Sequence, residues 1–200
     1  MGGGVVTAPA VTAIVLAGGQ NSRMGRDKAL VTLGGIPLLA RVCQAAIAAG
    51  AAPVRIVTPR PARYRHRAPT ECTFCCERDR GQGPLAGLVA GLERTETQWA
   101  LVLACDLAGI NAAELQHWMA QLPKEADGTV AQLPFRSARW EPLCGFYKRD
   151  CLPSLRAHLR SGQRSLQDWL AQQPVGTLTV SDPQALWNCN APADLAARGA

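Results

Sequence analysis

The chain has 200 residues and a mass of 21.2 kDa, enough for one globular domain with a sizeable core. Hydrophobic residues make up 48% and charged residues 18%, which excludes a disordered or collagen-like chain. The net charge is +6, with 18 arginines and three lysines among the basic residues. Such a balance favours acidic partners, which are nucleic acid, membrane headgroups or a phosphorylated small molecule.

The first residues show no sign of a secretory leader. They lack a positively charged region, and the apolar run at 11–17 is too short for a signal peptide. No apolar run reaches the length that spans a bilayer. We therefore expect a cytoplasmic protein without a membrane partner, a single domain over residues 1–200, a disordered stretch at 1–10, and eight cysteines that remain free thiols.

Strands and helices alternate along the predicted elements. In chain order we expect a strand at 11–16, a helix at 37–49, strands at 54–58 and 72–76, a helix at 84–92, a strand at 99–105, a helix at 111–121, strands at 129–133 and 143–147, helices at 150–160 and 165–172, a strand at 175–180 and a short helix from 192. This order predicts an α/β fold with three layers, in which helices cover both faces of a mostly parallel, Rossmann-like sheet. Ligands of such sheets bind outside the carboxyl ends of the strands.

Basic residues concentrate between the second predicted strand and the second long helix, at 53–80. This segment carries seven arginines against three acidic residues. A solvated connection, an electrostatic collar for an anionic substrate and a nucleic-acid surface all agree with that pattern. Aromatic residues are not interleaved with these arginines, which argues against a platform for stacking single-stranded nucleic acid.

A glycine-rich loop follows the first predicted strand, with the sequence LAGGQNSRMGRDK at 16–28. Paired glycines let backbone N–H groups approach a ligand, and successive amides in such a turn form an anion site. Arg23 and Lys28 add positive charge. The loop matches neither the P-loop nor the dinucleotide-binding pattern. A structural turn is the alternative interpretation.

Asp106 follows the most apolar predicted strand, WALVLAC at 99–105. A carboxylate at the carboxyl end of a buried strand lies where the ligand crevice is expected. Mg²⁺ takes one or two carboxylates and completes its shell with waters and substrate phosphates. Asp106 is therefore a candidate Mg²⁺ ligand, and a helix cap is the alternative.

Four motifs together resemble the molybdenum cofactor guanylyltransferase family, whose members are nucleotidyltransferases with a glycosyltransferase-A-like fold. They are the loop at 16–28, GPLAG at 83–87, ACD at 104–106 and WNCNAPADL at 187–195. Their order and spacing match from Thr12 to Leu195. The resemblance implies a Mg²⁺-dependent transfer of GMP from GTP to the terminal phosphate of Mo-molybdopterin, with release of pyrophosphate.

The resemblance also implies roles for individual residues. Arg23, Lys28 and Asp106 would be catalytic, with Mg²⁺ on Asp106. The residues that would bind GTP are Leu16, Ala17, Gly18, Gly19, Lys28, Asp106 and one or both of Glu77 and Asp79. Asn188 and Asn190 would bind the acceptor, with turn chemistry before a helix as the alternative. The implied partner proteins are the molybdenum insertion protein and molybdoenzyme chaperones, and nucleic acid is not among the partners.

Two positions depart from the pattern of the family. Relatives often have Asn at the end of the second strand, where this chain has Thr58. Trp140 and Glu141 stand where a histidine is expected on the acceptor side.

The sequence also allows two other functions. A nucleotidyltransferase of the same fold that uses CTP or a sugar phosphate is the nearest alternative, although relatives that use CTP tend to read LAAG rather than LAGG. A non-catalytic nucleotide sensor or RNA-binding module is a third, and Lys28 together with Asp106 argues against it.

Cysteines and histidines are the remaining candidates for metal ligands or catalysts. The cluster of Cys72, Cys75 and Cys76 has no second pair of ligands, so free thiols are favoured over zinc. The three histidines, His66, His117 and His158, lie on predicted surface segments and suggest no catalytic triad.

Overall fold

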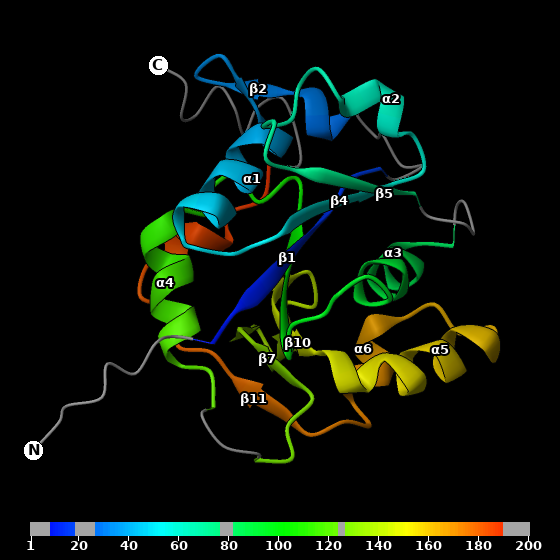
Figure 1. Cartoon of the computed structure of the whole chain (residues 1–200). Coiled ribbons are helices and arrows are strands. Elements are labelled where there is room, and N and C mark those ends of the chain that lie inside the picture. The colour runs from blue at the N-terminus through cyan, green and yellow to red at the C-terminus, as the bar shows by residue number, and fades with distance from the viewer. Residues whose placement is uncertain (1–8, 19–26, 77–81, 124–126, 190–200) are drawn as a thin grey trace, which may run out of the picture.

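A seven-stranded sheet forms the centre of the computed structural model, which describes residues 9–18, 27–76, 82–123 and 127–189 (Figure 1). Its strands lie in the order β11-β7-β10-β6-β1-β4-β5. Their bounds are β1 (Val11–Leu16), β4 (Val54–Thr58), β5 (Thr73–Cys76), β6 (Trp99–Ala104), β7 (Ala131–Leu133), β10 (Cys144–Lys148) and β11 (Val175–Thr177).

Helices cover both faces of this sheet (Figure 1). They are α1 (Leu38–Ala48), α2 (Pro61–Tyr64), α3 (Pro84–Leu92), α4 (Ala112–Ala120), α5 (Leu152–Arg160) and α6 (Leu166–Leu170). Three short 3-10 helices are η1 (Lys28–Leu30), η2 (Arg149–Cys151) and η3 (Pro183–Leu186). Two small hairpins pair β2 (Thr32–Leu33) with β3 (Ile36–Pro37) and β8 (Phe135–Arg136) with β9 (Arg139–Trp140).

The sheet is mostly parallel, as the alternating pattern predicts. β1 pairs in parallel with β4 and β6, β4 with β5, and β7 with β11. β10 is the exception, because it runs antiparallel between β6 and β7. The predicted fold class is therefore confirmed.

Two cores lie on opposite faces of the sheet because successive strand residues point to opposite sides. In β1, Ala13 and Val15 pack into the core formed with α1 and α4. Ile14, between them, packs into the core formed with α3, α5 and α6. Helix α3 lies close to β1 at two glycines: a Cβ on Gly87 would stand 3.3 Å from Leu16, and one on Gly91 only 2.6 Å from Ile14. The closing glycine of GPLAG thus permits helix–sheet contact.

Several boundaries differ from the sequence-based prediction for local reasons. The strand expected from 129 begins at Ala131, because Asp127 Oδ1 accepts a hydrogen bond from the Thr129 N–H and forms a turn. The strand expected to 180 ends at Thr177, because Gln121 Oε1 captures the N–H of Thr179. The predicted helix from 192 and most of the stretch at 1–10 lie outside the described residues.

No helix within the described ranges is long and apolar enough to cross a bilayer.

Glu114 fastens the start of the segment 181–189 to helix α4. Its carboxylate, 2% exposed, accepts hydrogen bonds from the Ser181 N–H at 2.8 Å, the Asp182 N–H at 3.0 Å and the Ser181 hydroxyl. Farther along, Trp187 O accepts from the Gly109 N–H at 3.2 Å. A Cβ on Gly109 would collide with the carbonyl of Gln184, at 1.8 Å, so this contact requires glycine.

We expect Glu114→Gln to destabilise the protein by about 2 kcal/mol at neutral pH, because the buried amide cannot accept the same three bonds. Burial raises the pKa of Glu114, but the hydrogen bonds from Ser181 and Asp182 outweigh burial and hold that pKa below its ordinary value. The stabilisation by the Glu114 carboxylate is therefore complete when the pH is above the pKa of Glu114 in the unfolded chain. It is lost as the pH falls through the pKa of Glu114 in the folded protein.

Urea denaturation between about pH 6 and pH 3 measures this effect. The difference in free energy of unfolding between wild type and Glu114→Gln should narrow as the pH falls. Glu93→Gln is the matched control, since the Glu93 ion pair with Arg156 is largely exposed. A gap that stays constant down to the lowest pH would contradict the assignment to the Glu114 carboxylate.

Candidate functional site

Lys28 and Asp106 meet at one edge of the sheet. They follow β1 and β6, which are parallel neighbours, so both carboxyl ends open on the same edge. Lys28 Nζ lies 3.3 Å from Asp106 Oδ2, and the two side chains remain 26% and 22% exposed. The structure thus joins two predicted site residues that are 78 positions apart.

Asp27 stands next to this pair and is held by two hydrogen bonds and one ion pair. Its Oδ1 accepts from the Ala29 N–H at 3.2 Å and so caps η1. Its Oδ2 accepts from the Tyr64 hydroxyl at 2.6 Å and lies 3.0 Å from Arg63 Nε. Burial raises the pKa of Tyr64 and the Asp27 carboxylate raises it further, so the phenol stays a hydrogen-bond donor. Sequence reasoning assigned no role to Asp27 or Tyr64, although Asp27 belongs to the motif that contains Lys28, and it placed Arg63 only among the basic residues of 53–80.

The glycine turn begins where the hydrogen bonds of β1 end. Leu16 O accepts from the Cys105 N–H at 3.1 Å, and the Ala17 N–H donates to Val57 O at 2.9 Å. Gly18 is the first exposed residue, with φ at +118°, and a Cβ there would stand 3.0 Å from Pro59 Cδ. The turn therefore needs glycine at this position.

Five predicted site residues lie outside the described ranges. They are Gly19, Arg23, Glu77, Asp79 and Asn190.

Thr58 ends β4 beneath the glycine turn. The residue is fully buried, and its Oγ1 accepts from the Arg60 N–H at 3.2 Å. A Cβ on Gly18 would stand 3.4 Å from the same oxygen. The Thr58 side chain therefore caps its own strand and supports the turn.

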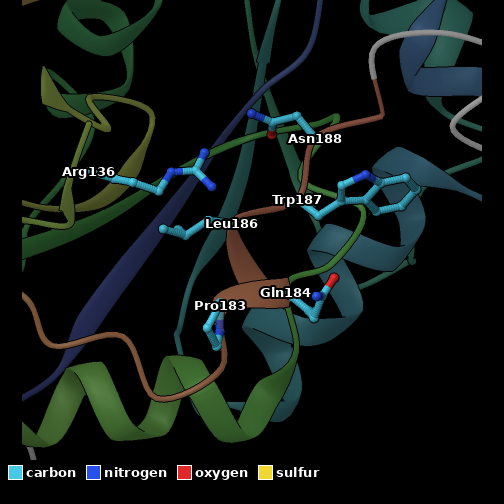
Figure 2. Close-up of a pocket in the computed structure, with 6 residues that line it drawn as sticks. All are labelled: Arg136, Pro183, Gln184, Leu186, Trp187 and Asn188. Carbon is cyan, nitrogen blue, oxygen red and sulfur yellow. The ribbon is translucent and has the colours of Figure 1, made fainter. Parts of the chain in front are cut away.

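A shallow pocket of about 450 Å³ opens between the β8–β9 hairpin and the segment around η3. Figure 2 shows the guanidinium of Arg136 extending toward Leu186 and Asn188. Arg136 Nη2 is also 3.2 Å from Glu141 Oε1. Asn188 Oδ1 is buried and has no hydrogen-bond partner among the described residues. The full lining is Arg136, Pro183, Gln184, Leu186, Trp187 and Asn188.

The structure connects this pocket to the Lys28–Asp106 pair through the backbone. The Cys189 N–H donates to the backbone carbonyl of Asp106 at 3.0 Å. Asn188, the residue before Cys189, is therefore held close to Asp106. Arg136 could not be identified from the sequence, because a short hairpin brings it to the pocket.

Side chains that could act as nucleophiles are not activated near Asp106. Burial raises the pKa of Cys105 to about 12, and the Asp106 and Asp27 carboxylates add to the shift. His66 and His117 are exposed, and the half-buried His158 ring lies 3.1 Å from Ser165 O. Within the described ranges, no group of three His, Cys, Asp or Glu residues could hold a metal on its own. This holds for the cluster of Cys72, Cys75 and Cys76, of which Cys72 and Cys75 are buried.

These features suit the binding and neutralisation of a polyphosphate more than covalent catalysis. A partly exposed ammonium, a partly exposed carboxylate and a glycine turn converge on one sheet edge. Oriented charges of this kind stabilise charge that develops on phosphoryl oxygens. The pocket that Asn188 lines adjoins them.

Comparisons with known proteins agree with this chemistry. Residues 13–177 match the family model described as MobA-like NTP transferase domain. The chain is 49% identical over 186 residues to a Nostoc sp. protein named probable molybdenum cofactor guanylyltransferase, covering 93% of this chain and 89% of the relative.

Two solved structures share the fold. One is molybdopterin-guanine dinucleotide biosynthesis protein A from Archaeoglobus fulgidus, with a TM-score of 0.74, 23% identity and coverage of 94% and 96% of the two chains. The other is 2-C-methyl-D-erythritol 4-phosphate cytidylyltransferase from Thermus thermophilus, with a TM-score of 0.67, 18% identity and coverage of 95% and 97%. At these identities the likeness concerns the fold alone.

Proposed function

Because this chain belongs to the MobA-like NTP transferase family, we propose that it transfers GMP from GTP to the terminal phosphate of Mo-molybdopterin. The products are molybdopterin guanine dinucleotide and pyrophosphate. The observation that carries the proposal is the meeting of Lys28 and Asp106 beside the glycine turn. An ammonium and a carboxylate at that edge suit a nucleoside triphosphate better than any neutral substrate.

In this reaction an oxygen of the acceptor phosphate attacks the α-phosphorus of GTP. A new P–O bond forms, the bond from the α-phosphorus to the bridging oxygen breaks, and pyrophosphate leaves with that electron pair. Lys28 would neutralise charge on the triphosphate and on the leaving group, and Gly18 would let the backbone approach the nucleotide. Arg23, Gly19 and the acidic pair Glu77 and Asp79 complete the proposed nucleotide site from outside the described residues.

The described residues fit a Mg²⁺ ion that arrives with the nucleotide. Asp106 offers a partly exposed carboxylate, and no preformed cluster of three ligands accompanies it in the described ranges. Mg²⁺ commonly binds through one or two carboxylates together with substrate phosphates, so Asp106 would hold it. When bound, the ion would withdraw negative charge from the phosphoryl oxygens. Lys28 already balances the Asp106 charge and would turn toward the phosphates.

The pocket beside η3 is the proposed acceptor site. Asn188 Oδ1 is buried without a partner, so a ligand that donates an N–H or O–H to this oxygen would satisfy it after a small adjustment. Arg136 offers a guanidinium to an acidic group, and Trp187 is another of the lining residues. Asn190 is the second acceptor residue of the proposal. A molybdenum insertion protein would supply the acceptor, and molybdoenzyme chaperones would receive the product.

Titration calorimetry with Mg²⁺ and each of GTP, CTP, ATP and UTP tests the choice of nucleotide. We expect GTP to bind at least about 10-fold more tightly than the others, because specific hydrogen bonds to a base discriminate by roughly 1–3 kcal/mol. A preference for CTP would favour the cytidylyltransferase alternative. Binding without turnover in the presence of acceptor would favour a nucleotide sensor.

Asp106→Asn should lower the transfer rate by at least about 100-fold, because the amide cannot hold a divalent cation as a carboxylate does. Lys28→Ala should lower kcat/KM for GTP by a similar factor. Both variants should keep the melting temperature within a few degrees, since the pair is partly exposed. Asp150→Asn, an exposed change at η2, is the control. Substantial Mg²⁺-dependent transfer by Asp106→Asn would remove Asp106 from the site.

Asn188→Ala and Arg136→Ala should each raise the KM for the acceptor by about 10-fold and leave the KM for GTP unchanged. Arg139→Ala is the matched control, because Arg139 lies on the same hairpin without lining the pocket. Steady-state kinetics with either substrate varied would measure the split. An equal effect of the Arg136 and Arg139 changes would point to general charge and not to this pocket.

A further inference from the structure

We propose that Tyr64 and Arg63 are positioning residues that hold Asp27 and thereby set Lys28 for phosphate binding. This inference rests on the proposed function in one respect only, which is that Lys28 binds the phosphates of a nucleotide. It does not depend on which base the nucleotide carries or on the acceptor.

The carboxylate of Asp27 is held by two hydrogen bonds and an ion pair, and its side chain is 17% exposed. Oδ2 accepts a hydrogen bond from the Tyr64 hydroxyl at 2.6 Å and forms an ion pair with Arg63 Nε at 3.0 Å, and Oδ1 accepts a hydrogen bond from the Ala29 N–H at 3.2 Å. Hydrogen bonds to an ionised acceptor are short and strong, so these donors fix both the position and the rotation of the carboxylate.

Fixing Asp27 also fixes the backbone of Lys28, the next residue. Lys28 is the first residue of η1, a 3-10 turn that begins with the Asp27 cap. The Leu30 N–H donates to Asp27 O at 3.0 Å, and the Val31 N–H donates to Lys28 O at 3.1 Å. A lysine side chain has four rotatable bonds, so the position of its Nζ depends on where this short turn places its Cα. The distance of 3.3 Å between Lys28 Nζ and Asp106 Oδ2 therefore depends on the turn.

Tyr64 and Arg63 stabilise the Asp27 carboxylate in different ways. Tyr64 is 2% exposed and packs in the core with β1 and α1, so its hydroxyl comes from a rigid part of the fold. Arg63 is 43% exposed and supplies a positive charge. Together they satisfy Asp27 Oδ2, which would otherwise be a competing anion one residue away from the Lys28 ammonium. Lys28 is thereby left directed at Asp106 and at an incoming phosphate.

Binding of Mg²⁺-pyrophosphate, measured by titration calorimetry, tests the role of the Tyr64 hydroxyl. Tyr64→Phe keeps the buried ring and should weaken pyrophosphate about 5-fold. In a Lys28→Ala background, titrated to millimolar pyrophosphate, the same change should cost less than about 2-fold, because the hydroxyl acts through Lys28. Tyr147→Phe is the matched control, since it also removes a buried hydroxyl, one that donates to Pro142 O at 2.7 Å, far from Asp27 in the fold.

The Arg63 series provides a second test that does not alter the core. Arg63→Ala should weaken Mg²⁺-pyrophosphate about 3-fold, and Arg63→Lys should restore most of that affinity by keeping a charged donor. Arg65→Ala removes the same charge from an exposed residue of the same segment that does not pair with Asp27. It should have an effect below about 1.5-fold.

Three results would overturn the proposal. They are an unchanged affinity of Tyr64→Phe, an equal loss for Tyr64→Phe with and without Lys28, and an equal loss for Arg63→Ala and Arg65→Ala. The last result would assign the arginines to a general electrostatic collar. Pyrophosphate carries no base, so these measurements remain valid if the protein prefers CTP. If wild type fails to bind pyrophosphate, the phosphate role of Lys28 is wrong and the inference falls with it.

Discussion

The parallel contact between β1 and β6 is the constraint on which the site depends. Leu16 is in register with Ala104, and the Cys105 N–H continues the ladder to Leu16 O. Since parallel strands end on the same edge, the chain after β1 and the chain after β6 must leave the sheet together. This single register brings Lys28 to Asp106. A slip of one residue would turn the side chains of either strand to the opposite face and separate the pair.

The surrounding elements hold that register in place, together with the chain segments that follow β1 and β6. Helix α3 can lie against β1 only because Gly87 and Gly91 lack a Cβ. On the other face, Glu114 and Gly109 hold the segment that carries Asn188 against the chain after β6. The proposed acceptor pocket is therefore attached to the same strand end as the carboxylate of Asp106. Both proposed substrates would be oriented by one rigid edge, which is how proximity lowers the barrier of a transfer between two anions.

The sequence alone predicts the order of the seven strands of the sheet and of every described α-helix except α2, because apolar runs and glycine stops mark them, but it does not predict the two small hairpins. It also assigns Lys28 and Asp106 to one site, and the structure adds their direct ion pair. The pocket is different: Ser137 and Ala138 form the β8–β9 turn with φ of +49° and +60°, where Asn-Gly would give a recognisable signal. Tyr64 and Arg63 are equally hidden, because their contact with Asp27 joins segments 37 residues apart that share no pattern.

The basic composition of the chain turns out to be a poor guide to binding strength. Three cations near the proposed ligands each lie beside a carboxylate: Lys28 by Asp106, Arg63 by Asp27 and Arg136 by Glu141. At each of these three described cations, an incoming phosphate must therefore exchange with a carboxylate. Such an exchange is favourable only when the ligand offers more charge, or a better geometry, than the partner it replaces. At Lys28, a polyphosphate carrying its own divalent cation would meet that condition, because Asp106 would hold the cation while Lys28 binds the phosphates. Selectivity for such a ligand would then follow from the pairing of charges at the strand ends.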